Sequence, residues 1–531
     1  MKNKLILSLL VAVSITASAF AQQGYTRIHN KMLDDAKSLY AGSQWLEAQK
    51  AYKKLLSVDT AFADVYYEIG VCETHLPGQR ERAVTHFEQA ARHGSLEAQY
   101  QLALARHKEE RFDEEIGLLT AYKQGTEHEI DNTEIDRRIT IANTAKELRA
   151  FPTEMKIKNM GALINSEAHD YCPLVTADGN TMYFTSRREG SVGGMRDPSG
   201  QYFEDIYVAK RIDEIWSNAT NAGVPLNTYV QDATVGLSAD GNEMIIYRTA
   251  QNLVSGDLFS CKRMQGLWQM PEKMTDRINS AYHEPSATIS PDGSEIYFTS
   301  DRPGGFGGRD LYRIRRLPNG EWSLPLNLGP TINTANDEDA PFMHSDGTTL
   351  FFSSNGHNTM GGYDIFKARL IDPDMNGWNA PENMGAPLNT VNDDIYFCMS
   401  EDGQTGYFSS ERPGGFGGQD IYEVTFPSSQ IEYVAVRGVI VNASEEPVKA
   451  RITLNGSKGE GIAGVYNSNP RTGRYLMVVQ PSQKYTYTVE AEGYDTKTAE
   501  LHADSPADGS HEIALDITLT RNENTARVAK P

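Results

Sequence analysis

The sequence predicts a multidomain chain with one α-helical part followed by two all-β parts: a helical solenoid, a five-bladed β-propeller and a small β-sandwich. A helical pattern of period 3.6 runs from Tyr25 to about Phe151 and repeats. A turn-and-strand unit then recurs five times. After Ile431 short strands continue without that repeat. The predicted regions are 22–151 for the helices, 152–427 for the propeller, 431–521 for the sandwich and 522–531 for a disordered tail.

The charge of the chain excludes two classes of function. The 531 residues carry a net charge of −21, which becomes −23 when Lys2 and Lys4 of the first 21 residues are removed (−21 − 2). Phosphate recognition and docking on anionic lipid both need a basic surface. We therefore expect neither nucleic acid nor an anionic membrane as a partner. No segment after residue 21 approaches the roughly 20 apolar residues of a membrane-spanning helix.

The N-terminus has the pattern of a signal peptide. Met1–Lys4 is basic, Leu5–Phe20 is apolar, and Ala19–Ala21 is a small-x-small cleavage site. We expect cleavage after Ala21 and an exported mature chain that starts at Gln22. A membrane anchor is disfavoured because the apolar core is short. A lipid anchor is not expected because no cysteine lies near the cleavage site.

The cysteines do not form a metal or redox motif. They show no CxxC pair and no metal-ligand spacing, so we expect buried thiols. Whether Cys172 and Cys398 pair in an oxidising compartment stays open. The four are Cys72, Cys172, Cys261 and Cys398.

The helical region repeats with offsets of 35 and 32 residues. The aligned triplets are Ala48, Tyr52, Leu55; Ala83, Phe87, Ala90; and Glu115, Leu119, Tyr122. These offsets are close to 34, and the region resembles the tetratricopeptide family, although the third triplet departs from it. The resemblance implies a groove for a partner protein. A helical spacer is the alternative.

Each of the five β units contains an Asp-Gly turn. The turn precedes a strand-like run such as Ile296–Ser300 and a second anchor, an Asp before an apolar-aromatic pair. A period of 50-odd residues with four short strands is typical of a propeller blade. The turn aspartates, 62, 52, 54 and 56 residues apart in succession, are Asp178, Asp240, Asp292, Asp346 and Asp402.

The connectors between units predict how the ring closes. A copy of the connector, Asn159–Asn165, precedes the first unit, and none follows the fifth. We therefore expect Met155–Met160 to supply the outer strand that the fifth blade lacks, which would remove exposed sheet edges.

Two phrases carry a resemblance to known propellers. Ser290–Gly293 with Ile296–Arg302 resembles the WD-repeat-like, TolB-type repeat. Arg302–Asp310 and Arg412–Asp420 resemble the variant found in OmpA-associated periplasmic proteins. Residues 431–521 resemble a carboxypeptidase regulatory-like domain, which implies an immunoglobulin/transthyretin-like β-sandwich without the peptidase site.

An acid lies eight residues before every Asp-Gly turn. In a propeller these positions share one mouth of the central channel, so they could form an acidic ring for Ca²⁺ or a basic partner. The favoured interpretation is that each acid caps the backbone of its own turn. We therefore expect no metal site. The five candidates are Asp170, Asp232, Glu284, Glu338 and Asp394.

Two further motifs are interpreted as structural. Asp372–Gly377 starts like a calcium loop but has Asn383 at its twelfth position, so a hairpin turn is expected. The loops Gly304–Gly308 and Gly414–Gly418 lack the surrounding βαβ unit of a dinucleotide fingerprint. Their phenylalanines are expected to pack on the blade.

No linear catalytic motif occurs, neither G-x-S-x-G nor H-E-x-x-H. The order of the parts resembles the OmpA-associated periplasmic component of the type IX secretion system, although the sequence stops before the OmpA-like domain of that family. The resemblance implies a periplasmic, non-enzymatic envelope scaffold with protein partners, near the outer membrane or peptidoglycan, and with no cofactor. The alternative is an exported propeller enzyme, a hydrolase or lyase, because such sites assemble from separate blades.

Overall fold

The computed structural model describes residues 29–57, 63–76, 79–125, 128–197, 200–213, 215–373, 375–401, 403–427, 434–456, 462–481, 483–503 and 512–522. The predicted signal peptide and nearly all of the predicted tail lie outside this set. The chain divides into two compact units between Lys146 and Glu147. No helix within the described ranges is both long and apolar enough to cross a membrane.

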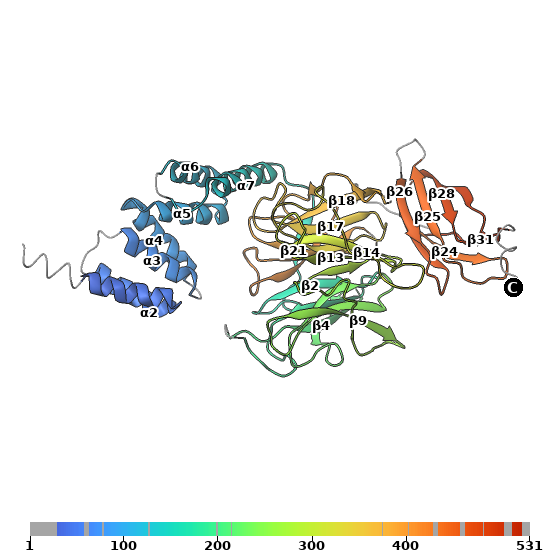
Figure 1. The fold of residues 1–531 in the computed structure, drawn as a ribbon, viewed down its shortest axis with the longest axis horizontal. Helices are drawn as coiled ribbons and strands as arrows, with labels where there is room; N and C mark the ends of the chain where they lie inside the picture. The colour runs from blue at the N-terminus through green and yellow to red at the C-terminus, as the bar shows by residue number, and fades with distance from the viewer. Residues whose placement is uncertain are drawn as a thin grey trace, which may run out of the picture. The chain divides into compact units, whose positions relative to one another are not determined.

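The first unit is built from helices, and consecutive helices from α2 to α6 pack on one another (Figure 1). The predicted faces are buried, with Tyr52 and Phe87 at 0% and 3% exposure. A Cβ at Gly70 would lie 2.5 Å from the Phe87 ring, so this glycine allows the close approach of α3 and α4. After a helical segment at 29–41 come α2 Trp45–Leu56, α3 Ala63–Thr74, α4 Arg80–Arg92, α5 Leu96–Lys108, α6 Phe112–Lys123 and α7 Asn132–Ala150.

Glu115, where the third helical repeat departs from the pattern, has a buried partner. Its Oε2 lies 2.8 Å from Nδ1 of His107, and both side chains are buried. A paired acid can occupy a position that is apolar in the other repeats, because the hydrogen bond offsets the cost of burial.

Each of the five predicted β units forms its own antiparallel sheet within the described residues. The inner strands β2, β7, β12, β16 and β21 contact one another in succession, and β21 contacts β2, so the arrangement is propeller-like. The strands of units 1 and 2 are β2 Asp170–Val175, β3 Thr181–Ser186, β4 Asp205–Ile212, β5 Ile215–Trp216, β6 Thr220–Asn221, β7 Asp232–Leu237, β8 Glu243–Thr249, β9 Gly256–Met264, β10 Leu267–Trp268 and β11 Glu272–Lys273. Those of units 3 to 5 are β12 Ala287–Ile289, β13 Glu295–Ser300, β14 Asp310–Arg315, β15 Leu326–Asn327, β16 Glu338–Met343, β17 Thr349–Ser354, β18 Asp364–Asp372, β19 Gly377–Trp378, β20 Glu382–Asn383, β21 Asp394–Met399, β22 Thr405–Ser410 and β23 Asp420–Thr425.

The predicted pairing of the segment Met155–Met160 with unit 5 is confirmed. Strand β1, Lys156–Asn159, pairs antiparallel with β23 and completes the sheet of unit 5. The Asn159 amide donates to Asp420 at 2.8 Å, as Asn221 does to Asp205 at 2.6 Å within unit 1. The connector before unit 1 therefore serves unit 5 as the later connectors serve their own units.

The C-terminal part consists of two sheets with a shared apolar core. One sheet has the order β27-β24-β30 with β31 also on β24, and the other has the order β26-β25-β28-β29. Val436, Ile452 and Val489 lie in the core between them. The strands are β24 Val434–Asn442, β25 Arg451–Gly456, β26 Ile462–Asn467, β27 Arg474–Val479, β28 Lys484–Glu490, β29 Lys497–His502, β30 Glu512–Ala514 and β31 Ile517–Leu519.

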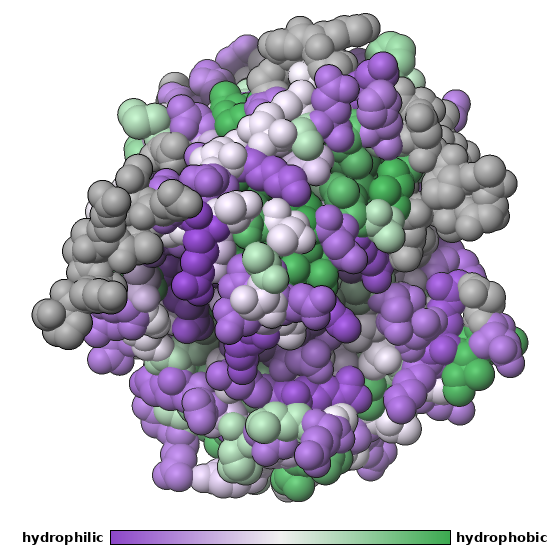
Figure 2. All heavy atoms as spheres, turned by 90° about the vertical axis from the view of Figure 1, so that its right-hand side faces the viewer, coloured by the Kyte–Doolittle hydropathy of each residue, from purple (hydrophilic) through white to green (hydrophobic). Residues whose placement is uncertain are grey.

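The surface agrees with the acidic, hydrophilic composition. Figure 2 shows one face of the molecule on which hydrophilic side chains predominate and hydrophobic ones form small separate patches.

Candidate functional site at the channel mouth

The five predicted ring acids are buried and cap the turns of their own units. Each accepts the backbone N–H of the residue four positions before it, at 2.6–3.0 Å, and the hydroxyl of the same residue. Those capping partners are Ser166, Thr228, Ser280, Thr334 and Thr390. This is the arrangement expected of structural acids.

Four of the ring acids also pair with an arginine of the same unit, which accounts for their charge. Asp170, Asp232, Glu284 and Asp394 pair with Arg188, Arg248, Arg302 and Arg412. Unit 4 instead carries His357, whose Nε2 lies 2.8 Å from the Ile332 carbonyl oxygen. Burial raises the pKa of Glu338, the ring acid of unit 4. No three His, Cys, Asp or Glu side chains gather as a metal site among the residues that the structure describes.

Replacing Glu284 by Gln is expected to cost no more than about 1–2 kcal/mol of unfolding free energy. The amide oxygen still accepts from Ser280, and Arg302 keeps the Ile278 carbonyl at 2.7 Å. Excess chelator is expected to leave the melting temperature unchanged. A drop of several degrees on adding chelator, absent in Glu284→Gln, would show that the ring binds a cation, because a ligand of the native state stabilises it by mass action.

The calcium-loop-like segment is a hairpin between β18 and β19. Met375 N donates to Asp372 Oδ1 at 3.0 Å, and Asn376 takes a φ of 54° in the turn. Asp374 lies outside the described residues. The predicted packing of the loop phenylalanines is wrong, because Phe306 and Phe416 are 49% and 48% exposed.

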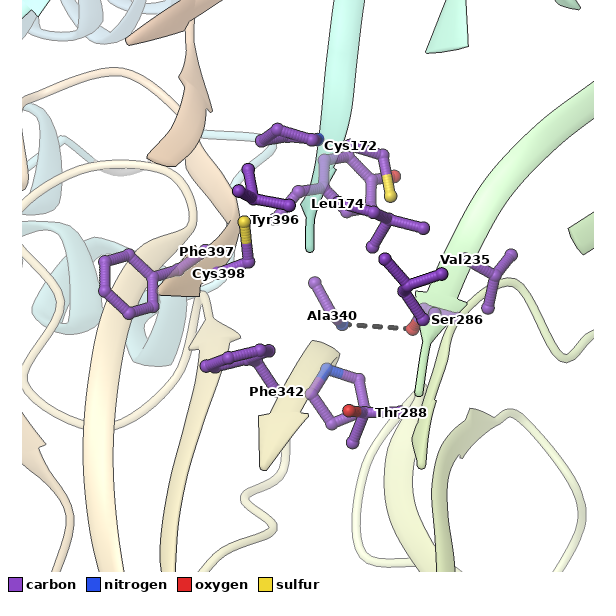
Figure 3. A pocket seen from close by; sticks show the side chains of 15 residues that line it. Cys172, Leu174, Val235, Ser286, Thr288, Ala340, Phe342, Tyr396, Phe397 and Cys398 are labelled. Carbon is purple, nitrogen blue, oxygen red and sulfur yellow. Dashed lines mark hydrogen bonds between the residues drawn. The ribbon is translucent and has the colours of Figure 1, made fainter. Parts of the chain in front are cut away.

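Side chains of the inner strands surround a small cavity, which we call the channel (Figure 3). The cavity of about 40 Å³ is lined by side chains from all five units, among them Leu174, Val235 and Phe342. This volume holds a few water molecules. A sugar-sized ligand therefore does not fit inside this cavity.

Cys172 and Cys398 both line this channel and are free thiols. Cys172 Sγ donates to the Thr234 carbonyl at 3.0 Å. Burial raises the pKa of Cys172 to about 12 and raises that of Cys398 as well. Both thiols therefore stay protonated and unreactive.

Bulges turn the inner strands at the end where they begin, which we call the channel mouth. The pairing register between the inner strand and the next strand of its unit shifts after Tyr171, Thr234, Asp339 and Ile395. Cys172, Ala340 and Tyr396 adopt positive φ values of 52°, 49° and 61°. Non-glycine residues seldom take this conformation, and bulges re-aim side chains at functional sites.

Two tyrosines and a carboxylate meet at the mouth. The rings of Tyr171 and Tyr396 stack with centroids 5.9 Å apart. The pKa of Tyr171 is raised by burial and by the Glu204 carboxylate, with which Tyr171 shares a hydrogen bond. Burial, with a smaller contribution from Glu204, raises the pKa of Tyr396 and raises that of Tyr247 to about 12. Glu204 is partly exposed and lies close to tyrosines of units 1, 2 and 5.

A buried acid holds an arginine beside this group. Asp339, 2% exposed, pairs with Arg309, whose side chain is 35% exposed. Asp339 also accepts from Ala340 N at 2.7 Å and from the Ser286 hydroxyl. Asp339 contributes to raising the pKa values of Tyr396 and Tyr363. Its oxygens are therefore engaged, and it positions Arg309.

Sequence reasoning missed this cluster because its members break the repeat. The residue after the ring acid is Tyr171, Ala233, Pro285, Asp339 or Ile395 in the five units. That variation, directly after an acid that recurs in every unit, is the signal that the sequence offered for Tyr171 and Asp339.

Comparison with known proteins gives fold-level likeness only. No protein-family model and no curated protein matches the chain. Solved structures that are similar include a TolB-type protein from Agrobacterium tumefaciens, 15% identical over 61% of this chain and 96% of its own, with a TM-score of 0.30. An endo-arabinase from Bacteroides thetaiotaomicron is 13% identical over 50% and 96% of the two chains, with a TM-score of 0.33. A sialidase from Trypanosoma rangeli is 10% identical over 65% and 76%, with a TM-score of 0.30.

The expectation that the chain is not an enzyme is wrong. Enzymes named glycoside hydrolase, endo-arabinase, arabinofuranosidase and sialidase are among the similar structures, alongside the TolB-type protein. The absence of a linear motif did not exclude catalysis, because residues of a site that assembles from separate strands are far apart in the sequence.

Proposed function

We propose that this chain is an exported protein that binds a glycan at the channel mouth and cleaves it, as a hydrolase or lyase. The observation that carries the proposal is the convergence of Tyr171, Tyr396 and Glu204 from separate strands on the open end of a channel too narrow to take a ligand itself.

The chemistry of these groups fits such a site. Glu204 is a partly exposed carboxylate and takes the role of general acid or base, one of the two roles that carboxyl groups fill in glycoside hydrolysis. Tyr171 keeps its proton because its pKa is raised, so it donates to Glu204 and orients the carboxylate. Arg309, held by Asp339, presents donors to substrate oxygens.

The test is a screen of soluble polysaccharides for binding, for new reducing ends and for unsaturated products. We expect at least one substrate, and we expect Glu204→Gln to lower its cleavage by about 10²–10⁴-fold. Glu272→Gln on the exposed strand β11 is the matched control and should keep full activity. Absence of cleavage across the screen, or cleavage that Glu204→Gln leaves intact while its melting temperature is normal, would contradict the proposal.

We further propose that the parts are a tetratricopeptide-like solenoid at 22–151, a five-bladed β-propeller at 152–427 and a carboxypeptidase regulatory-like β-sandwich at 431–521. Five antiparallel sheets joined in a cycle support the propeller, and two sheets around one core support the sandwich. We propose a periplasmic location after cleavage at Ala21, near the outer membrane, in an assembly of the type IX secretion kind. Intact-mass measurement of the periplasmic protein tests the cleavage.

A second candidate function is protein binding by the helical unit. Consecutive helices of this unit from α2 to α6 pack on one another, as in the helical repeats that bind partner proteins. Deleting residues 22–146 should then abolish recovery of an envelope partner from periplasm, whereas deleting residues 431–521 should leave that recovery unchanged. Equal recovery by the two truncated chains would contradict this function.

A further inference from the structure

Exposed aromatic rings lie at the end of the sheets where the inner strands begin. Phe306 and Phe416 occupy matching glycine-rich loops of units 3 and 5, and Tyr229, 57% exposed, lies on the connector into unit 2. These segments lie at the end where the inner strands begin, because the loops follow the antiparallel partners of those strands. We call these three side chains the aromatic rim.

The rim is held rigidly. Phe306 N donates to Asp310 Oδ2 at 2.7 Å, and a Cβ on Gly307 would lie 2.0 Å from the Asn336 carbonyl. The loop backbone is therefore pressed against the next connector. The Phe416 loop repeats both features. Phe416 N donates to Asp420 Oδ2 at 2.6 Å, and a Cβ on Gly417 would lie 2.0 Å from the Ala168 carbonyl oxygen. The Tyr229 hydroxyl accepts from Gln251 at 2.9 Å.

Unit 4 shows that the loop does not force its side chain outward. Met360 N donates to Asp364 Oδ2 at 2.8 Å, in the position of Phe306 and Phe416, yet Met360 is fully buried. The rim is thus interrupted at unit 4. There the polar groups of Tyr363, Asp337 and Arg309 lie instead, with Arg309 N donating to Asp337 at 2.9 Å.

We propose that the ligand of the mouth is a neutral polysaccharide chain that crosses it over unit 4 and rests sugar rings on Phe306 and Phe416. This substrate class presupposes the glycan site proposed above. Sugars present flat C–H faces that pack on aromatic rings, while their hydroxyls need polar partners such as those of unit 4. The rings stand apart rather than forming the contiguous patch of a protein interface.

The charges at the mouth favour a neutral chain over an acidic one. Glu204, Asp337 and Asp339 are acidic groups at the mouth. Arg309 already pairs with Asp339, and Arg187, which acts on Tyr171, already pairs with Asp197. A polyanionic polysaccharide would meet net repulsion there.

The test is calorimetric titration of the full chain with neutral oligosaccharides of increasing length from the polysaccharide that binds. Affinity is expected to rise about tenfold or more with length. The double variant Phe306→Ala, Phe416→Ala should lose that rise while its affinity for the shortest binder stays unchanged. Ile215→Ala, an exposed apolar residue at the hairpin of β4 and β5 away from the mouth, should behave as the wild type.

Four outcomes would overturn the inference. If the double variant keeps the length dependence while Glu204→Gln abolishes cleavage, the rim plays no part and the proposed function stands. If carboxylated polysaccharides bind more tightly than neutral ones, or if the double variant loses only a protein partner, the substrate class is wrong. If no polysaccharide binds, both the inference and the proposed function are wrong.

Discussion

Deleting strand β1 is expected to destabilise the propeller-like region by at least about 3 kcal/mol. A chain that starts at His169 lacks the four β1 residues paired with β23, and each lost ladder bond costs about 0.5–1.5 kcal/mol. It also lacks the buried side chains of Met155 and Ile164. Urea unfolding of this chain, compared with one that starts at Glu154, measures the difference.

The control for this comparison is Lys158→Ala in the chain that starts at Glu154. Lys158 lies on β1 but is exposed, so its replacement should change the unfolding free energy little. Equal stability of the two truncated chains would contradict the closure of the ring by β1.

Replacing Arg412 by Met is expected to cost about 3–5 kcal/mol at neutral pH, because it leaves a buried carboxylate without its cation. Arg412 Nη2 lies 2.6 Å from Asp394 Oδ1, and Asp394 is fully buried. Arg263→Met is the matched control. Arg263 lies over the ring of Trp268, as Arg412 lies over that of Phe408, but Arg263 is on an exposed hairpin.

The cost of Arg412→Met should fall with decreasing pH. Burial already raises the pKa of Asp394, and the loss of Arg412 removes an influence that lowers it. A carboxyl with a raised native pKa is stabilised in the fold by protonation, so stability returns as the pH falls through that pKa. Thermal melts at several pH values test this. A cost equal to that of Arg263→Met at neutral pH would contradict the structural role of the pair.

The framework of the β units could be predicted because it depends on local repeats. Asp-Gly marked the turns, and the extra copy Asn159–Asn165 marked the strand that unit 5 borrows. The ring acids were recognisable as turn caps, since each lies four residues after its own Ser or Thr. The arginine partners could not be assigned without the sheet that brings Arg188 back to Asp170.

The candidate site could not be predicted because it depends on departures from the repeat. Tyr171, Glu204 and Tyr396 occupy unrelated positions in units 1 and 5 and meet only when the ring closes. The positive φ of Tyr396, which helps to direct its ring, arises at a bulge that no local motif marks. The exposure of Phe306 and the burial of Met360 in equivalent loops likewise follow from tertiary packing.

The most direct measurement is a crystal structure of the full chain with a bound neutral oligosaccharide from the polysaccharide screen. We predict sugar density at the channel mouth, with a hydroxyl or glycosidic oxygen within hydrogen-bond distance of Glu204 and a sugar ring against Phe306 or Phe416. Density confined to the β-sandwich, the helical unit or the opposite end of the channel would contradict the assignment of the mouth as the functional site.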